Sequence, residues 1–462
     1  MYNLKIRNGK IIDFEKETQT ICNIAVKNGK IVCIGQCSED AEKEIDAKGN
    51  IVSPGFIDIH MHEETIGNTI DGDDYDIANK MLSMGVTTCV SGNCGNNRQS
   101  IYEFFEFVDR KGAPVNYLSF IGHNYLRNVI GVERYTSATK EEILKMGNLA
   151  SDAIEKGAIG ISFGLEYSPG IKYSEVIDLC NSIKDKDILL SAHYRKDAKY
   201  GIDSIKELIN ISMETGLPMQ ISHLGSCTAY GMMKESLRVI EEAVKSGVDI
   251  SADCYPYDAF STYIGSSVFD DGCFNLWNKS FDSILLTEEP YKGVRCDKDT
   301  FYKVRKEYPN MLAVAFVMNE EEVIEALKSP YVMVASDGLY NRGQGHPRGA
   351  GTFPRILGKY VRELNALSLT DALKKMTIIP AKRLGLNNKG QIKEGYDADL
   401  VIFNPDKIID TASFDKPTEK SEGISYVIID GKIALEDNKI ENGRLGKIIR
   451  KNELSRGGKL YD

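Results

Sequence analysis

Residues 54–62, PGFIDIHMH, decide the fold class of this chain of 462 residues. The apolar run 56–60 is typical of a short buried β-strand, and His60 and His62 stand at its end. Side chains alternate along a strand, so residues two apart point to the same side. The spacing therefore predicts two imidazoles that face one site at the end of this strand, where both are candidate metal ligands.

Similar strand-like runs recur downstream, and amphipathic stretches such as 140–157 and 233–247 lie between most of them. Together with 56–60 they give eight predicted strands, the others being 87–92, 117–122, 160–164, 188–192, 219–223, 249–253 and 332–336. Alternating strands and helices indicate an α/β protein, and eight such units over residues 54–384 predict a TIM (β/α)8 barrel. The irregular stretch at about 258–330 is long for one connection, so we expect a lid or a specificity insert.

Both ends of the chain differ from this middle part. Residues 1–53 read as short strands, with hairpin signals at Asn8-Gly9 and Asn28-Gly29, because a type I′ turn needs positive φ at both central positions. The same style returns in residues 385–462, for example in DADLVIFNP and SYVIIDGKIALED. We therefore predict one small β-sandwich domain built from both termini, with 385–462 also supplying a tail.

Composition excludes several classes of partner. The net charge of −10 argues against binding to nucleic acid or to an anionic membrane. The first residues lack the apolar core of a signal peptide, and nowhere do about 18 uncharged apolar residues run together. These features predict a cytoplasmic protein. The ten cysteines contain no CxxC pair, so we expect reduced and mostly buried thiols.

The six histidines are distributed unevenly. Five of them stand at or just past the end of a predicted strand, namely His60, His62, His123, His193 and His223. The carboxyl ends of barrel strands meet at one rim, so this bias predicts imidazoles gathered around a metal. His193 and His223, which end the fifth and sixth strands, are ligand candidates, although each alone could be a core imidazole bonded to a carbonyl.

Three further residues carry candidate chemistry at strand ends. Cys94, in VSGNCGNN, supplies a thiolate, which is a strong zinc ligand; taken alone it would be a buried thiol. Asp337 follows the eighth strand and could ligate a metal and transfer protons, or merely cap a turn with Gly338. Glu166 could bridge or orient a ligand, or pair with a basic side chain.

A second group of residues suggests a substrate site. Arg348 lies in GHPRGAGTFPR, where a guanidinium could clamp a carboxylate in bidentate fashion. Tyr167 and Tyr255 follow strands and could donate hydroxyls to the same group. His123 and His346 are better explained as supports of Arg348 or of a loop than as ligands.

These motifs together resemble the amidohydrolase superfamily, and within it the N-acyl-D-amino-acid deacylases (D-aminoacylases). The resemblance runs nearly end to end, through PGFIDIHMH, GVTTCVSGNCG, IGHNYLR, ISFGLEYSPG, AHYR, ISHLG, DCYPYDA, ASDG, HPRGAGTFPRILG and GYDADLVIFNP. It implies one tight zinc held by Cys94, His193 and His223. It also implies a weaker second metal position formed by His60, His62 and Asp337, which shares Cys94.

The resemblance further implies that Asp337 is the acid and base, and that Arg348, Tyr167 and Tyr255 take the α-carboxylate of the substrate. The carbamylated lysine that commonly bridges metals in this superfamily is absent from IGISFGLE, which leaves Cys94 or Glu166 as the bridge. The stretch HLGSCTAYG lacks the basic residue found there in acidic-selective relatives.

The predicted activity is zinc-dependent hydrolysis of the amide bond of small N-acyl-D-amino acids, which yields a carboxylate and a free D-amino acid. One alternative is a cyclic-amide (hydantoin- or dihydroorotate-like) hydrolase or a D-residue dipeptidase of the same superfamily. Another is a non-catalytic barrel that acts as an assembly protein. The sequence leaves open the acyl group, the side-chain preference and the oligomeric state.

Overall fold

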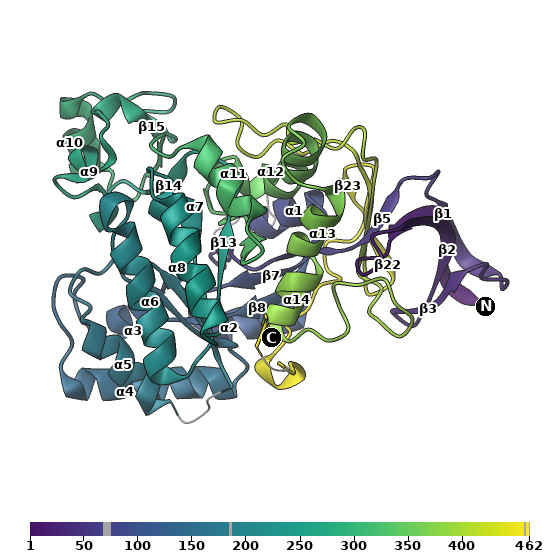
Figure 1. Cartoon of the computed structure of the whole chain (residues 1–462), viewed down its shortest axis with the longest axis horizontal. Coiled ribbons are helices and arrows are strands. Elements are labelled where there is room, and N and C mark those ends of the chain that lie inside the picture. The colour runs from purple at the N-terminus through teal and green to yellow at the C-terminus, as the bar shows by residue number, and fades with distance from the viewer. Residues whose placement is uncertain (68–74, 184–186, 457–458, 462) are drawn as a thin grey trace.

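The computed structural model describes residues 1–67, 75–183, 187–456 and 459–461. Figure 1 shows a large α/β part, drawn in blue, teal and green, beside a smaller part of strands in which the purple N-terminal strands lie next to those from the C-terminal region. No helix among the described residues has the length and apolar character needed to cross a membrane.

The large part is a closed parallel barrel, which confirms the predicted fold class. Strands β9 to β13 and β17 form one parallel sheet in the order β17-β13-β12-β11-β10-β9, and β6 to β8 form a second parallel sheet. The two sheets join where Asp337 N–H donates to the carbonyl of His60 at 2.8 Å and His62 N–H donates to that of Gly338 at 3.1 Å. All eight predicted strands occur: β6 (Phe56–Asp58), β7 (Val86–Ser91), β8 with β9 (Asn116–Ser119 and Ile121–Gly122), β10 (Gly160–Gly164), β11 (Leu189–His193), β12 (Met219–Ile221), β13 (Ile250–Cys254) and β17 (Val332–Val334).

Helices cover the outside of the barrel. Helix α4 begins with a capping box, in which Thr139 and Glu142 satisfy each other's backbone N–H groups, and it buries the face that carries Ile143, Met146 and Ala150. The described helices of the barrel are α1 (Asp76–Ser83), α2 (Ile101–Lys111), α3 (His123–Ile130), α4 (Lys140–Glu155), α5 (Tyr173–Ser182), α6 (Gly201–Thr215), α7 (Leu224–Thr228), α8 (Met233–Lys245), α11 (Glu320–Lys328), α12 (Arg348–Arg355), a π-helical turn (Ile356–Glu363), α13 (Leu369–Met376) and α14 (Ile378–Leu384).

The terminal strands form one nine-stranded sheet around its own apolar core, in agreement with the predicted sandwich domain. Strand β5 pairs antiparallel with β20, so that Ser53 lies opposite Val401 and the two ends of the chain become one domain. The strands are β1 (Tyr2–Ile12), β2 (Gln19–Lys27), β3 (Lys30–Gly35), β4 (Ala41–Asp46), β5 (Ile51–Pro54), β20 (Leu400–Phe403), β21 (Ile424–Ile429), β22 (Lys432–Glu436) and β23 (Lys439–Ile440).

The two Asn-Gly pairs behave differently. Asn28-Gly29 forms the predicted hairpin between β2 and β3, with φ of 51° and 73°. The hairpin predicted at Asn8-Gly9 is wrong, because this pair forms a β-bulge inside β1 where the register with β2 shifts. A Cβ at Gly9 would lie 2.6 Å from Cγ2 of Val52, so this glycine permits a close approach of two strands.

The predicted insert is ordered, with short elements of its own. It contains the antiparallel sheet β14 (Phe260–Tyr263), β16 (Leu312–Ala315) and β15 (Ile284–Leu286), together with α9 (Cys273–Trp277) and α10 (Lys298–Glu307). These elements project at one corner of the molecule in Figure 1. The stretch looks irregular in the sequence because strands of three or four residues leave little periodicity.

The cysteines depart from the expected pattern at one place. Cys33 and Cys37 form a disulfide in the terminal domain, with their Cα atoms 5.7 Å apart, so the expectation that all ten are reduced is wrong for this pair. The chain bends just after β3 and brings the two residues together, which their spacing alone did not indicate. Cys94, by contrast, is a buried free thiol.

Candidate metal centre

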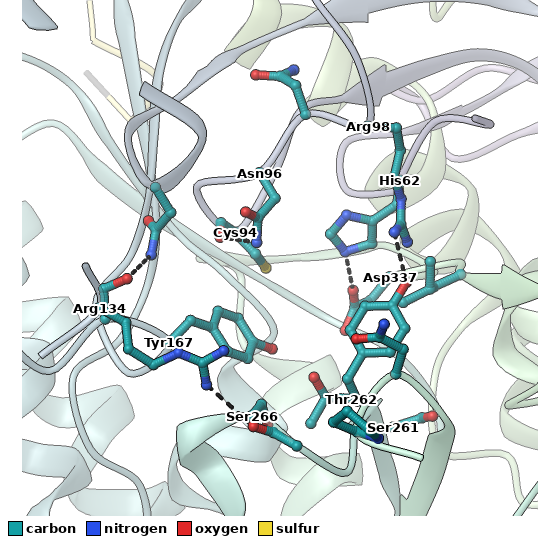
Figure 2. Close-up of a pocket in the computed structure, with 18 of the residues that line it drawn as sticks. His62, Cys94, Asn96, Arg98, Arg134, Tyr167, Ser261, Thr262, Ser266 and Asp337 are labelled. Carbon is teal, nitrogen blue, oxygen red and sulfur yellow. Dashed lines mark hydrogen bonds and ion pairs between the residues drawn. The ribbon is translucent and has the colours of Figure 1, made fainter. Parts of the chain in front are cut away.

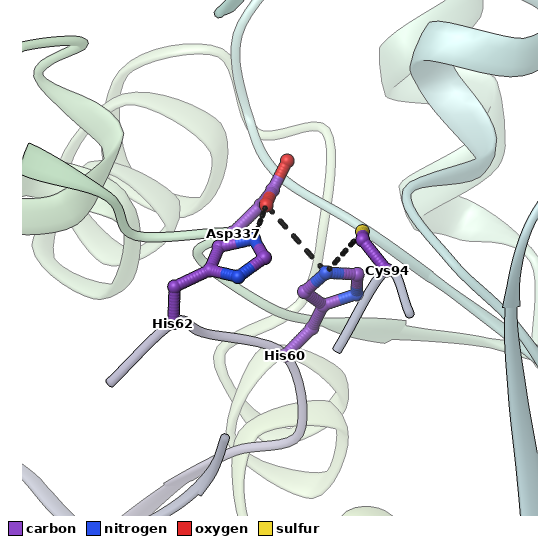
Figure 3. A group of neighbouring side chains, drawn as sticks. All are labelled: His60, His62, Cys94 and Asp337. Carbon is purple, nitrogen blue, oxygen red and sulfur yellow. Dashed lines mark hydrogen bonds and ion pairs between the residues drawn. The ribbon is translucent and has the colours of Figure 1, made fainter. Parts of the chain in front are cut away.

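Six side chains at the ends of five barrel strands meet at one rim of the barrel. Their donor atoms form two groups, and within each group all atoms lie within 4.8 Å of one another. One group is His60, His62, Cys94 and Asp337 (Figure 3). The other is Cys94, His193 and His223. The thiol of Cys94 belongs to both groups and lies between them.

The distances show how closely the donors converge. Cys94 Sγ lies 3.3 Å from Nε2 of His60 and 3.4 Å from Nε2 of His223. His193 Nδ1 is 3.0 Å from Nε2 of His223. Asp337 Oδ1 contacts Nε2 of His62 at 3.1 Å. Donor atoms that lie this close together could all contact one cation.

Three of these donors have a strained backbone. The φ angles of Cys94, His223 and Asp337 are 53°, 34° and 49°. Residues other than glycine adopt this left-handed region only at a cost in free energy. Hydrogen bonds hold two of them there: His223 N–H donates to Oδ1 of Asp253 at 2.7 Å, and Asp337 N–H donates to the carbonyl of His60 at 2.8 Å. Strain at three converging donors points to a functional site.

Further contacts orient the two histidines of the second group. His193 Nε2 donates to Oε2 of Glu166 at 3.0 Å, which leaves Nδ1 facing the cluster. Ser226 Oγ lies 2.8 Å from Nδ1 of His223, which leaves Nε2 facing Cys94. Such contacts fix the orientation of a metal-binding imidazole. Glu166 touches the far nitrogen of His193 and belongs to neither donor group, so its geometry favours orientation over bridging.

The electrostatics of the cluster favour an anion among cations. Burial raises the pKa of the Cys94 thiol, but the charges of His60 and His223 outweigh it and hold that pKa well below its usual range. Burial lowers the pKa of His193, but Cys94 and Glu166 more than offset it, so the pKa is about 9. A thiolate held by positive charge is the state in which a cysteine binds metal.

The donor set fits zinc. Nitrogen, sulfur and carboxylate oxygen are the ligands that zinc takes in proteins, and three or four of them make a site. The side chains are almost fully buried, with exposed fractions of 0% for His60, 12% for His62 and 9% for Asp337. Burying a thiol, imidazoles and a carboxylate together is costly unless they are paired or bind a metal.

Arg348 is already engaged inside the protein. Its Nη2 pairs with Oδ2 of Asp337 at 2.9 Å and its Nε donates to the Asp337 carbonyl at 2.8 Å. Its Nη1 is buried and has no hydrogen-bond partner among the described residues. A bidentate clamp formed by Arg348 alone is therefore ruled out in this arrangement, because Nη1 is the one guanidinium nitrogen still available.

Two tyrosines lie near these groups. The ring of Tyr255 is 4.7 Å from the guanidinium carbon of Arg348, and its hydroxyl is buried without a hydrogen-bond partner among the described residues. The ring of Tyr167 lies 4.4 Å from that of His193. Both tyrosines thus border the donor groups, as their positions after strands predict.

The two remaining histidines lie outside both donor groups. His346 accepts the backbone N–H of Arg348 on Nδ1 at 3.0 Å and lies 3.1 Å from the Ala259 carbonyl through Nε2. Burial and the Arg348 charge hold the pKa of His346 well below its usual range, so the imidazole stays neutral. His123, the first residue of α3, lies 3.1 Å from Glu175 on α5. His346 therefore supports Arg348, whereas His123 supports a helix.

A cavity of about 320 Å³ opens above the metal candidates (Figure 2). Sequence reasoning missed most of its walls, including two arginines, Arg98 and Arg134. Arg98 follows Cys94 by four residues in the same loop, which is the only signal that the sequence offers. The residues lining the cavity are His62, Cys94, Asn96, Asn97, Arg98, Asn124, Asn128, Arg134, Tyr167, Ser168, Ser261, Thr262, Tyr263, Gly265, Ser266, Pro309, Asn310, Asp337, Leu339 and Arg348.

Comparison with known proteins identifies the family. Residues 51–434 match the model of the amidohydrolase family. The chain belongs to the amidohydrolase family. It is 31% identical to the D-aminoacylase of Alcaligenes xylosoxydans xylosoxydans, over 97% of each protein. The family and the buried donor groups make this chain a metal-dependent amidohydrolase.

Solved structures of related amidohydrolases have the same fold. A D-aminoacylase described for its binuclear metal center superposes with a TM-score of 0.87 at 29% identity, covering 97% of this chain and all 100% of the other. An N-acyl-D-glutamate deacylase from Bordetella bronchiseptica, complexed with zinc and a phosphonate mimic of the tetrahedral intermediate, gives 0.86 at 29% identity, covering 97% and 99%.

Proposed function

We propose that this amidohydrolase cleaves the amide bond of N-acyl-D-amino acids with the help of zinc. The observation that carries the proposal is the position of Asp337, whose carboxylate contacts His62 in the donor cluster and Arg348 in the cavity. One side chain thus links the candidate metal position with a candidate substrate anchor. The names of the related deacylases supply the substrate class.

Cys94, His193 and His223 would hold the tight zinc, and His60, His62 and Asp337 would form a weaker position that shares Cys94. When bound, zinc supplies Lewis acidity, which polarises a carbonyl and makes water a better nucleophile at neutral pH. Glu166 acts through His193, which it orients from the far nitrogen.

Asp337 is the proton carrier in this proposal. Burial raises the pKa of its carboxyl, but the Arg348 charge and the contact with His62 hold that pKa well below its usual range, so the group is ionised at neutral pH. As water attacks the acyl carbon, Asp337 takes one of its protons. When the C–N bond breaks, Asp337 returns this proton to the departing nitrogen, and a carboxylic acid and a free amine result.

Arg348 and Tyr255 would bind the α-carboxylate of the substrate. Nη1 of Arg348 and the hydroxyl of Tyr255 are both buried donors without a partner among the described residues. Unpaired buried donors are costly, and a carboxylate oxygen would satisfy both. Tyr167, beside His193 on the cavity wall, would donate to the same carboxylate.

The alternatives have less support. A cyclic-amide hydrolase or a D-residue dipeptidase could use the same donors, but residues 159–166 contain no lysine that could be carbamylated. A non-catalytic assembly protein would have no need for a complete donor set around a strained Asp337.

The test is a panel of N-acetyl and N-formyl D- and L-amino acids with added zinc, alongside hydantoins, dihydroorotate and D-containing dipeptides. We expect hydrolysis of the D-derivatives. Asp337→Asn should lower kcat by about a hundredfold or more, because proton transfer by a positioned side chain contributes that much. Asp152→Asn, on the exposed face of α4, is the control. Turnover like that of the wild type in Asp337→Asn, or activity confined to cyclic substrates, would overturn the proposal.

A further inference from the structure

The cavity above the donor cluster carries excess positive charge. Its described lining contains three arginines, Arg98, Arg134 and Arg348, and a single carboxylate, Asp337. Most of its other lining side chains are amides or hydroxyls, and the only aliphatic ones are Pro309 and Leu339. The charge of this wall therefore favours a substrate group that is negatively charged.

Arg98 is held rigidly in this wall. Its backbone N–H donates to Oε1 of the buried Glu63 at 2.7 Å, while Oε2 of Glu63 accepts from Gly92 N–H at 3.0 Å. One carboxylate therefore clamps both ends of the loop that carries Cys94. The Arg98 side chain is fixed separately, because Nη1 donates to the hydroxyl of Tyr263 on β14 at 2.6 Å.

The positive charge of the Arg98 guanidinium lies in the wall of the cavity. Among the described residues it forms no ion pair with a carboxylate, although it is half-buried. Tyr263 positions the guanidinium without neutralising it. A half-buried cation that is oriented but unpaired is poised for an anionic ligand, since guanidinium binds carboxylates through several directed hydrogen bonds.

Arg134 lies on the opposite side of the same cavity (Figure 2). Its Nη1 donates to the Gly265 carbonyl at 3.1 Å, and it too forms no ion pair with a described carboxylate. Arg134 is exposed, so it would act mainly by making the cavity mouth more positive. Both arginines are separate from Arg348, which our proposed function assigns to the α-carboxylate.

We propose that Arg98, assisted by Arg134, selects substrates that carry a second anionic group besides the α-carboxylate. This inference rests on the proposed function and narrows its substrate class to dianionic N-acyl amino acids. The second carboxylate could belong to the amino-acid side chain or to the acyl group, because both are attached to the scissile amide, and the experiment below distinguishes the two.

The experiment compares matched substrates. N-acetyl-D-glutamate is measured against N-acetyl-D-glutamine and N-acetyl-D-norleucine, and N-succinyl-D-alanine against N-butyryl-D-alanine. For at least one pair we expect kcat/KM to favour the anionic member by about tenfold to a hundredfold, which is the value of one hydrogen-bonded charged contact. The first set reports a side-chain carboxylate and the second an acyl carboxylate. Binding of the same compounds is measured in parallel by calorimetry on the zinc-loaded protein.

Variants identify the residue responsible. Arg98→Gln should remove most of the preference and leave turnover of the neutral substrates close to that of the wild type, while Arg98→Lys should restore part of it. Arg134→Gln should reduce the preference for anionic substrates less than Arg98→Gln does. Added salt should abolish the part of the preference that depends on Arg134. Arg110→Gln, an exposed arginine on α2, is the matched control and should change nothing. The Glu63 contact involves only the backbone of Arg98, so these variants keep the loop fixed.

The outcomes separate this inference from the proposed function. Hydrolysis of neutral and anionic members at equal rates, or a preference unchanged in Arg98→Gln, would overturn the inference and leave the function standing. Tighter binding of the anionic compounds, lost in Arg98→Gln but without hydrolysis, would support the inference and overturn the function. Neither binding nor hydrolysis of any compound would overturn both.

Discussion

Replacing Glu166 should weaken metal binding without removing a metal ligand. Its carboxylate accepts a hydrogen bond from Nε2 of His193 at 3.0 Å, and the two side chains are only 5% and 4% exposed. The imidazole turns its Nδ1 towards His223 and Cys94, so the carboxylate fixes the ring from behind. Loss of this contact leaves His193 free to rotate away from the cluster.

The expected magnitude follows from that geometry. Loss of a contact that orients a metal-binding imidazole costs about tenfold to a hundredfold in metal affinity. Glu166→Gln keeps an oxygen acceptor at the same distance and loses only the charge. We therefore expect zinc affinity to fall by about tenfold, or about 1.4 kcal/mol. Glu166→Ala removes the acceptor and leaves a buried N–H unpaired, so it belongs near the hundredfold end.

The assay is competition for zinc between the protein and a chelator, with the zinc content of each variant measured after dialysis. The molecule offers a matched control in Glu175, a buried carboxylate 3.1 Å from Nε2 of His123 and outside both donor groups. Glu175→Gln should lower the free energy of unfolding and leave zinc affinity unchanged. Wild-type affinity in both Glu166 variants, or an equal loss in Glu175→Gln, would refute the orienting role.

Three further predictions concern the same rim. Gly95→Ala should lower the free energy of unfolding by about 1–3 kcal/mol and reduce the zinc content. The reason is that Gly95 has φ of 76° and that a Cβ there would lie 2.0 Å from Oδ1 of Asn124. Denaturant unfolding and metal analysis measure the two effects. Zinc affinity should fall as pH drops below about 9, because the pKa of His193 in the metal-free protein is about 9 and its proton must leave before it ligates; pH-independent affinity would contradict this. Tyr255→Phe should raise KM by about tenfold without loss of stability, because its buried hydroxyl has no partner to lose among the described residues; a lower melting temperature with unchanged KM would argue against this.

Much of the barrel could be predicted because its signals are local. Each strand is a short apolar run, and the polar residue that follows it marks the carboxyl end, where barrel side chains converge. The same logic brought His60, Cys94, His193, His223 and Asp337 together as candidates, and their donor atoms do lie close to one another. Strand ends share a rim by topology, so no long-range information was needed.

The failures share a different cause, namely contacts between distant segments. Asn8-Gly9 has the composition of a turn, but its role is set by Val52 on a neighbouring strand. The engagement of Arg348 with Asp337 depends on how α12 begins after β17, and the sequence does not specify that. Arg98 enters the cavity only because Glu63 and Tyr263, from separate parts of the chain, hold it there.

The position of Cys94 explains why a cysteine can serve two donor groups at once. Its left-handed backbone, with φ of 53°, occurs at the tip of the loop after β7 and turns Sγ towards both His60 and His223. The next residue, Gly95, is fixed from the opposite side, where its N–H donates to Oγ of Ser162 on β10 at 3.0 Å. A side chain on β10 would have to be longer to reach the position of Cys94 Sγ, whereas the loop after β7 places a short thiolate there. In the metal centre that we propose, the loop that carries Cys94 would replace a bridging side chain on the fourth strand, and the same loop places Arg98 in the wall of the cavity.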